Sequence, residues 1–374
     1  MNEPARFPCA QCGADLRYDP GAQSLLCDHC GHSQPATLVE PEHAGVAAEE
    51  LREIDFHKAL ADEIAGADVE TTQTVSCENC GATVEFDENV HAAECPFCAT
   101  PVVTDTGSHR HFKPGGVLPF AVAEKDAQKA LRTWLESRWF APSGLRVFAR
   151  SGRRMSGVYI PYWTFDAQTR TKYEGQRGDV YYVEQARWVM RDGRRVRTRV
   201  RVPKVRWTPV RGRLQRFFDD VLVPASRSLP KRMIDRLSSW DLHALEPYRP
   251  DFLAGFRAEA YTVDLQEGFA AARAIMDLQI RRDVRFAIGG DKQRISSVRS
   301  QLSEETFKHI LLPVWVAAYR YRDQSYRVIV NGRTGEVIGE RPWSVWKIAL
   351  AGAGAAVLAA ALLYLAAIAG VFSR

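Results

Sequence analysis

The sequence predicts a protein of the α+β class, with a β-rich mixed domain, two small cysteine-bearing modules and one long C-terminal helix. Three observations support this fold class. All eight cysteines lie before residue 99, strand patterns dominate the middle of the chain, and residues 348–372 carry no charge. With 374 residues, the chain is long enough for two or three domains that each bury a core.

The cysteines form two sets with the same spacing, C-x2-C-x14-C-x2-C, and the second set repeats the first at an offset of 68 residues. The sets are Cys9, Cys12, Cys27 and Cys30, and then Cys77, Cys80, Cys95 and Cys98. Two residues between paired thiolates let both reach one ion at about 2.3 Å. The spacing therefore predicts two zinc ribbons, each with one structural zinc, because four thiolates leave no coordination position open.

Local features agree with this interpretation. Gly13, Gly31 and Gly81 follow three of the paired cysteines, where the chain is expected to turn with positive φ, and Ala99 replaces glycine in the fourth. Short hairpins are predicted between the pairs. His29, His32 and His91 exceed the needs of a four-thiolate site and are interpreted as surface residues.

Charge is distributed unevenly along the chain. Residues 1–100 contain 19 acidic and 4 basic residues, a net charge of −15. Because the whole chain carries +5, the rest carries +20. The second predicted ribbon has six acidic residues and no Lys or Arg, which is the wrong sign for a nucleic-acid backbone. Protein contact or scaffolding fits these ribbons better.

The predicted organisation has five parts. They are ribbon 1 (1–36), a helical linker (37–70), ribbon 2 (71–105), a basic α+β domain (106–340) and a membrane anchor (341–374). In the linker, Glu49–Ile64 has apolar residues near helical spacing and is predicted to form one amphipathic helix.

The basic domain is predicted to begin with a helix over Lys125–Phe140. Strands follow over Val158–Ala167 and Asp179–Glu184, and further helices over Leu229–Leu237 and Leu265–Arg282. The domain is predicted to end with four strands, at Ile295–Leu302, Leu311–Tyr321, Tyr326–Val330 and Val337–Gly339.

Residues 196–202 alternate valine or threonine with arginine, which predicts a half-buried strand with an arginine face. The candidate contacts for an anionic surface are Arg197, Arg199, Arg201, Lys204 and Arg206. Three interpretations stay open: a solvated face, a surface for anionic lipid headgroups, or a dock for the acidic ribbons. Nucleic acid is the weakest alternative, because aromatic residues are not interleaved as stacking platforms.

Residues 348–372 are apolar all round and long enough to cross a bilayer as a helix over about 347–372. Trp343 and Trp346 precede this segment, with Arg341 and Lys347 beside them, whereas Arg374 is the one charged residue printed after it. The positive side is thus the side of the large domain, which predicts a single-pass protein of the cytoplasmic membrane with residues 1–340 in the cytoplasm. Small residues such as Gly352 and Gly354 leave homo-oligomerisation through this helix open.

We expect no enzymatic activity. The sequence has no P-loop, no H-E-x-x-H, no G-x-S-x-G and no G-x-G-x-x-G. If all eight cysteines hold zinc, no thiol nucleophile is left. Asp219 and Asp220 are interpreted as a solvated turn, and no small-molecule substrate is inferred.

Together with the two ribbons and the anchor, the stretch VNGRTGEVIGERPW at residues 330–343 resembles a family of bacterial membrane proteins. These proteins are described as carrying a TFIIB-type zinc ribbon and sometimes as primosomal or helicase-like. The helicase label finds no support here, since the ATP-binding motif is missing. The resemblance implies eight zinc-ligating cysteines and association with membrane-stress systems that contain SPFH-type or phage-shock-type partners.

The sequence therefore predicts an adaptor fixed in the membrane by its tail, which recruits or scaffolds proteins at the cytoplasmic face. The alternative is a membrane-tethered nucleic-acid-binding protein.

Overall fold

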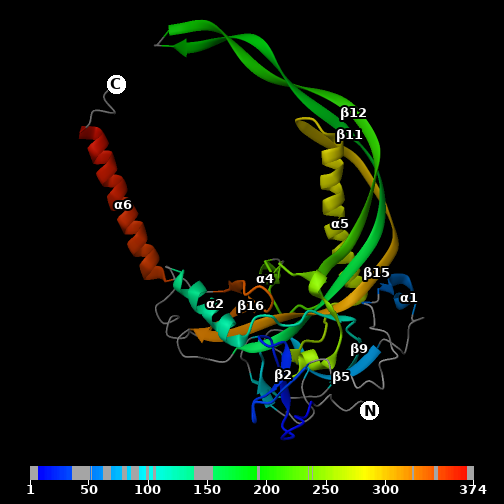
Figure 1. Cartoon of the computed structure of the whole chain (residues 1–374). Coiled ribbons are helices and arrows are strands. Elements are labelled where there is room, and N and C mark those ends of the chain that lie inside the picture. Colours follow the sequence, from blue (N-terminus) through cyan, green and yellow to red (C-terminus); the bar gives the residue numbers. More distant parts are fainter. Residues whose placement is uncertain are drawn as a thin grey trace.

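The fold is organised around three very long strands, which form an arch in the computed structural model of the chain (Figure 1). The central strand is β11 (Ser156–Arg191), paired antiparallel with β12 (Arg194–Pro224) on one side and with β15 (Lys292–Tyr321) on the other. The structure describes residues 7–35, 51, 53–61, 69–77, 82–85, 92–97, 101–103, 107–138, 155–191, 194–234, 236–237, 239–321, 324–340 and 344–368.

Short strands are added to these three long strands near their lower part, which gives a sheet of nine strands. We call this lower part of the sheet the base. The short strands are β4 (Ile54–Asp55), β10 (Gly116–Val117), β13 (Glu246–Pro247), β14 (Arg257–Ala258), β16 (Gln324–Asn331) and β17 (Val337–Gly339). Helices α2 (Glu124–Glu136), α4 (Lys231–Ile234) and the single turn α1 (Phe56–Leu60) lie at the base.

Two groups of small strands cover the base. The first group, β1 (Leu16–Asp19), β2 (Ser24–Cys27) and β3 (Ser33–Pro35), forms the sheet of ribbon 1. The second group consists of β5 (Val69–Ser76), β6 (Thr83–Glu85), β7 (Ala92–Glu94), β8 (Pro101–Val103) and β9 (Gly107–Phe112).

The two ribbons pack on opposite faces of the base sheet. Alternate residues of a strand point to opposite faces. Tyr159 and Trp315 belong to the apolar cluster that contains Tyr18 of ribbon 1. Their neighbours Val158 and Val314 belong to the cluster that contains Phe97 of ribbon 2. The base strands are therefore apolar on both faces, and the ribbon cores are continuous with the core of the domain.

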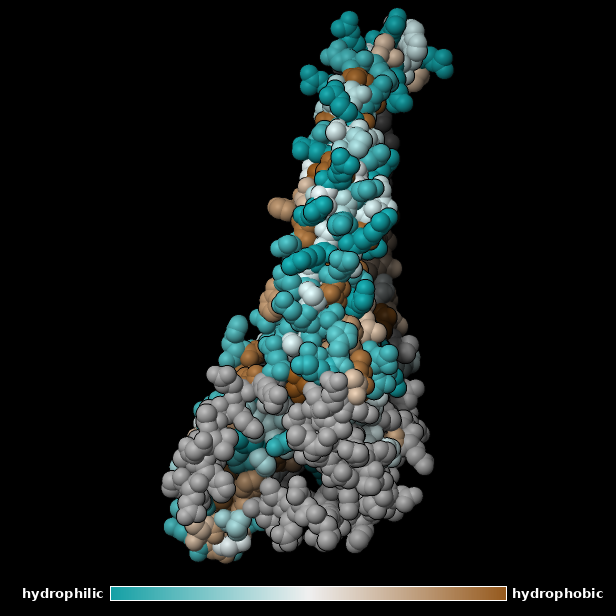
Figure 2. Space-filling view, turned by 90° about the vertical axis from the view of Figure 1, so that its right-hand side faces the viewer, coloured by the Kyte–Doolittle hydropathy of each residue, from teal (hydrophilic) through white to brown (hydrophobic). Residues whose placement is uncertain are grey.

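Above the base, one long helix covers the concave side of the arch. Helix α5 (Leu265–Ile288) begins at Asp264, whose side chain accepts from the Glu267 N–H at 2.7 Å, and it ends at Gly289. A stripe at helical spacing, including Ala272, Met276 and Ile280, packs against the sheet. The opposite, convex face is hydrophilic over most of its length (Figure 2).

The arch continues beyond α5 as two strands only. Gly178 pairs with Lys292 where β15 begins, and the hairpin continues without a third strand to the Arg191–Arg194 pair. We call residues 179–191 and 194–206 the distal ribbon.

Most predicted elements of the α+β domain are confirmed, with longer strands than the pattern indicated. The predicted strands 158–167 and 179–184 are one strand, β11, and the predicted strands 295–302 and 311–321 are one strand, β15. Strand β17 occupies Val337–Gly339 as predicted, and α2 ends four residues earlier than expected.

The single linker helix predicted over Glu49–Ile64 is wrong in its central part. Ile54 and Asp55 form strand β4, which pairs with Phe307 and Thr306 of β15. The described helix has only five residues, and it begins after Asp55, whose side chain accepts from the Lys58 N–H at 3.0 Å. The edge of β15 therefore overrides the weak helical periodicity.

The predicted apolar helix is present as α6 (Val345–Ile368). Its window Trp346–Leu365 has a mean hydropathy of 2.2 and no buried residue. The helix is therefore long and apolar enough to span a membrane. Residues 369–374 of the predicted anchor lie outside the described part.

The junction between α5 and the sheet depends on Phe307, which is fully buried among Phe112, Trp163 and Phe165. We expect Phe307→Ala to lower the free energy of unfolding by about 3–5 kcal/mol, because it leaves a cavity. Urea titration of the detergent-solubilised chain, followed by circular dichroism, measures this loss. Phe217→Ala is the matched control: Phe217 is exposed on β12, and a comparable loss there would contradict the packing described.

Candidate functional site

The first cysteine set forms a compact four-sulfur cluster. The Sγ atoms of Cys9, Cys12, Cys27 and Cys30 all lie within 4.8 Å of one another. Cys9 and Cys30 are 3.6 Å apart, and Cys12 and Cys27 are 3.5 Å apart. Four sulfurs at 2.3 Å from a tetrahedral ion are about 3.8 Å apart. This cluster can therefore hold one metal ion.

The backbone of both knuckles supports the cluster. Gly13 has φ +71° and Gly31 has φ +74°, so the predicted left-handed turns are confirmed at both positions. The N–H groups of these glycines donate to the carbonyls of Cys9 and Cys27, at 2.9 Å each. The backbone N–H of Cys30 lowers the pKa of the Cys27 thiol to about 6, whereas burial and the neighbouring thiols raise the pKa of Cys30.

Ribbon 1 is held on the base by specific contacts. Tyr18 is buried, its ring meets that of Phe252 edge-on at 5.5 Å, and its N–H donates to the Ala254 carbonyl at 3.0 Å. Cys9 and Cys27 belong to the same buried cluster. Loss of the metal should therefore disturb the base as well as the ribbon.

The second set is described in part. Cys77 and Cys95 are buried beside Phe97 in the cluster on the other face of the base. Cys80 and Cys98 lie outside the described residues, so the second zinc site stays a prediction. Ribbon 2 is fixed to the base by a bridge between Val84 and Glu259 and by the Ala260 N–H, which donates to the Thr83 carbonyl at 3.0 Å.

The predicted anionic contacts all lie on the distal ribbon, and all are exposed. Arg197, Arg199 and Arg201 share one face, whereas Lys204 and Arg206 belong to the other, because neighbouring positions of a strand alternate. The predicted strand and its arginine face are confirmed, but the face with the valines is less buried than expected. Val200 and Val202 are only partly covered, since no helix or third strand covers this part of the hairpin among the described residues.

Cross-strand pairing brings aromatic residues beside these arginines. Trp188 lies directly opposite Arg197, and Arg206 lies over the Tyr181 ring at 5.4 Å. The spacing of residues along the sequence did not predict this interleaving, because the aromatic residues and the arginines lie on different strands. The acidic ribbons lie at the base (Figure 1), so in the described part they leave the arginines of the distal ribbon uncovered.

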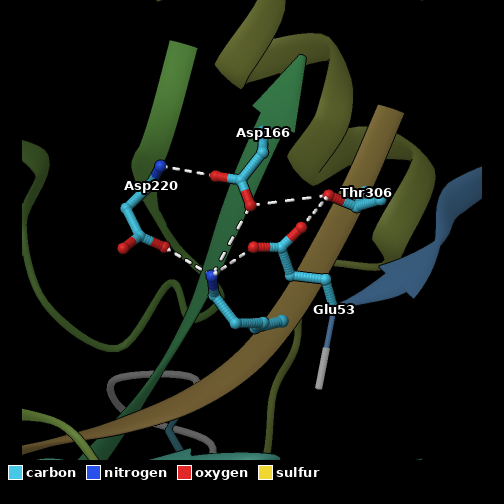
Figure 3. Close-up of polar contacts among 5 residues, drawn as sticks. Glu53, Asp166, Asp220 and Thr306 are labelled. Carbon is cyan, nitrogen blue, oxygen red and sulfur yellow. Dashed lines mark hydrogen bonds and ion pairs between the residues drawn. The ribbon is translucent and has the colours of Figure 1, made fainter. Parts of the chain in front are cut away.

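A buried polar cluster that the sequence analysis missed lies where the arch leaves the base (Figure 3). Lys308 of β15 is 2.9 Å from an Asp220 carboxylate oxygen, 3.4 Å from Glu53 and 3.5 Å from Asp166. The Asp220 N–H donates to Asp166 at 2.5 Å, and Thr306 donates to Glu53 at 2.9 Å. The register of β11 shifts at Asp166 in its pairing with β12 and again in its pairing with β15. The cluster therefore lies at a β-bulge.

The interpretation of Asp219 and Asp220 as a solvated turn is wrong, because both lie within β12 and Asp220 pairs with Lys308. Asp166, Asp219 and Asp220 also have oxygens within 4.8 Å of one another. The Lys308 ammonium already neutralises part of this charge. Burial raises the pKa of Asp166 to about 6, although the Asp220 N–H and Lys308 oppose the shift.

No family model matches the chain, and no solved structure matches it. One protein of Bacillus subtilis (strain 168) is similar. It is named "Uncharacterized protein YdjG", and it is 24% identical over 350 residues that cover 92% of each chain.

The cysteine geometry generates a prediction about metal content. We expect the purified chain to contain two zinc ions, and Cys27→Ser to lose one of them, because three thiolates hold zinc far less tightly than four. Elemental analysis measures the stoichiometry. The control is His29→Ala, since His29 is not among the four clustered sulfur ligands. A wild-type chain without zinc, or one that loses zinc with His29→Ala, would contradict the assignment.

The polar cluster generates a second prediction. We expect Lys308→Met to cost about 3 kcal/mol at pH 8, because it leaves the buried Asp166 carboxylate and the partly exposed Asp220 and Glu53 without their cation. Lys172→Met, which changes an exposed lysine of β11, should be almost neutral.

The loss in the Lys308→Met variant should depend on pH. The folded-state pKa of Asp166 lies above its unfolded value, so the folded state takes up a proton as the pH falls through about 6. Protonation then relieves the uncompensated charge, and the deficit should be smaller at pH 5 than at pH 8. Urea titrations at both pH values test this, and a deficit that grows toward pH 5 would show that the cluster is not held by charge.

Proposed function

We propose that the chain is a membrane-anchored zinc-ribbon adaptor that recruits or scaffolds proteins at the cytoplasmic face of a membrane. Helix α6 crosses the bilayer in this proposal, with Trp346 and Lys347 at the cytoplasmic interface. Both cysteine sets hold structural zinc. Each zinc closes a ribbon that covers one face of the base sheet, so the metal contributes rigidity to the base.

The observation that carries the adaptor function is an uncovered apolar stripe on α5. Ile275, Leu278 and Phe286 lie near one side of the helix, opposite its buried side, and Phe286 is 90% exposed. Because the buried side of α5 packs on the concave side of the arch (Figure 1), this stripe faces away from the sheet. Exposed apolar patches of this kind mark protein-interaction sites.

The charges around the stripe indicate the chemistry of the partner. Arg281, Arg282 and Arg285 are exposed on the same half of α5, and Asp283 is paired with Arg216 at 2.7 Å. A partner segment with apolar residues flanked by acidic ones complements this surface. By the resemblance drawn from the sequence, membrane-stress proteins of the SPFH or phage-shock type are the partners we expect.

The second candidate function is binding of nucleic acid at the membrane. Its support is the interleaving of Trp188 and Tyr181 with arginines on the distal ribbon, since such residues stack on bases while arginines contact phosphates. The acidic charge of residues 1–100 still disfavours this function for the two ribbons.

Site-specific photocross-linking in cells tests the adaptor function. A photoreactive residue in place of Leu278 should give a discrete protein adduct, whereas one in place of Arg170, exposed on β11, should give none. Phe286→Ser should weaken the Leu278 adduct at least several-fold, because it removes the most exposed apolar contact.

The size of the adduct separates the outcomes. An adduct with twice the mass of the chain would assign the stripe to a homo-oligomer contact instead of an adaptor surface. No adduct at Leu278, or equal adducts at Leu278 and Arg170, would refute the proposed partner site.

A further inference from the structure

The distal ribbon exposes large apolar side chains that the fold does not use. Trp188 is 67% exposed, and Met190 and Tyr182 are each 66% exposed. These three residues occupy alternate positions of one strand and therefore share a face. In a soluble hairpin, apolar residues of this size at a projecting end favour association with another surface.

The same face carries a row of arginines. In the pairing of β11 with β12, Trp188 lies opposite Arg197, Ala186 opposite Arg199 and Glu184 opposite Arg201, while Met190 lies opposite Arg195. Residues opposite each other in an antiparallel pair share a face. Glu184 is the acidic residue among them, with an oxygen 3.7 Å from Arg199. We call this the Trp–Arg face.

This combination suits the interface of a bilayer. Tryptophan is enriched where an apolar ring meets hydrated headgroups, and clustered arginines are attracted by anionic lipid. The two outer edges of the distal ribbon have unpaired backbone groups, so the ribbon cannot cross the hydrocarbon layer. It can lie along the surface, with Trp188 and Met190 reaching the acyl boundary.

The arrangement of the chain brings the distal ribbon toward that surface. In Figure 1 the arch and α6 rise from the same side of the base. The distal ribbon curves from the top of the arch toward the C-terminal end of α6 (Figure 1), so the ribbon and α6 lie on the same side of the base. The window Trp346–Leu365 of α6 has no buried residue, so this helix is free to be surrounded by lipid in the described part of the chain.

We propose that the Trp–Arg face of the distal ribbon is a second membrane-binding site, which lies in the headgroup layer of the anionic bilayer that α6 spans. Trp188 and Met190 insert at the acyl boundary, and Arg195, Arg197, Arg199 and Arg201 contact lipid phosphates. The chain is thereby attached to the membrane at two points, through α6 and through the distal ribbon. This inference rests on the proposed anchoring by α6.

Tryptophan quenching in reconstituted vesicles tests the site in the full chain. The chain is placed in phosphatidylcholine vesicles with brominated acyl chains, with or without phosphatidylglycerol. The signal of Trp188 is the difference in emission between the wild-type chain and the Trp188→Phe variant. The emission of the tryptophans beside α6 is present in both chains and therefore cancels. We expect this signal to be quenched in the anionic vesicles and to recover in high salt.

Two variants make the test specific. Trp207→Phe is the control for position, because Trp207 is on the same strand pair but lies beneath Arg294 at 4.0 Å, and its signal should stay unquenched. Replacement of Arg195, Arg197, Arg199 and Arg201 by Gln should abolish the quenching of Trp188. Replacement of Arg170, Arg211, Arg213 and Arg299, four exposed arginines of the three-stranded part, should leave it unchanged.

The outcomes distinguish the inference from the proposed anchoring. Flotation of the chain with neutral vesicles reports anchoring by α6 alone. If the chain floats but Trp188 is not quenched in anionic vesicles, the second site is refuted while the anchor stands. If, in addition, the quadruple Arg→Gln change at 195–201 abolishes binding to single-stranded RNA or duplex DNA in detergent, the face is a nucleic-acid site instead.

Discussion

The structure depends on the continuous two-sided pairing of β11. This strand pairs with β12 over nearly its whole length and with β15 over more than half of it, and its surroundings change along the way. At the base, both of its faces are covered, one by ribbon 1 and the other by ribbon 2. Higher up, α5 covers one face only. Beyond Gly178, β15 no longer pairs with β11, α5 lies outside this part, and no described element covers either face.

The composition of β11 follows these changes in cover. Residues 158–167 are buried on both faces and almost entirely apolar. In the middle, buried Thr169, Thr171 and Tyr173 alternate with exposed Arg170 and Lys172. Such alternation is expected for a sheet with one wet face. In the distal ribbon, the arginines of β12 and the aromatic residues of β11 both face solvent.

This arrangement also indicates what the two cysteine-bearing ribbons do for the fold. Ribbons of this size are too small to bury a core without metal or further contacts. Here Tyr18 and Phe97 insert into the two cores of the base, so each ribbon stabilises the sheet that also stabilises it. The charge separation read from the sequence is then spatial: the acidic ribbons lie at the base, and the strongly basic segment projects away from them.

The sequence predicted well what depends on local chemistry. The cysteine spacing identified the Cys9, Cys12, Cys27 and Cys30 cluster and the left-handed glycines beside it, and the uncharged run identified α6. The length of β11 was not predictable from hydrophobic patterning, because its middle part is held by threonines and by neighbours distant in the chain.

The polar cluster escaped prediction for a related reason. Lys308, Asp166 and Glu53 are far apart in sequence, and only the register of three strands brings them together. A signal was available nonetheless: Asp166 and Lys308 are charged residues within otherwise apolar strands, and such residues need a buried partner. Likewise, the pairing of Trp188 with Arg197 could be found only from the hairpin register.

The proposal depends most on α6, which holds the chain in a membrane. Alkaline carbonate extraction of membranes from cells that produce the chain tests it most directly, with a version that ends at residue 344 as the comparison. We expect the full chain to stay in the membrane pellet and the shortened chain to be released. Release of the full chain would contradict it.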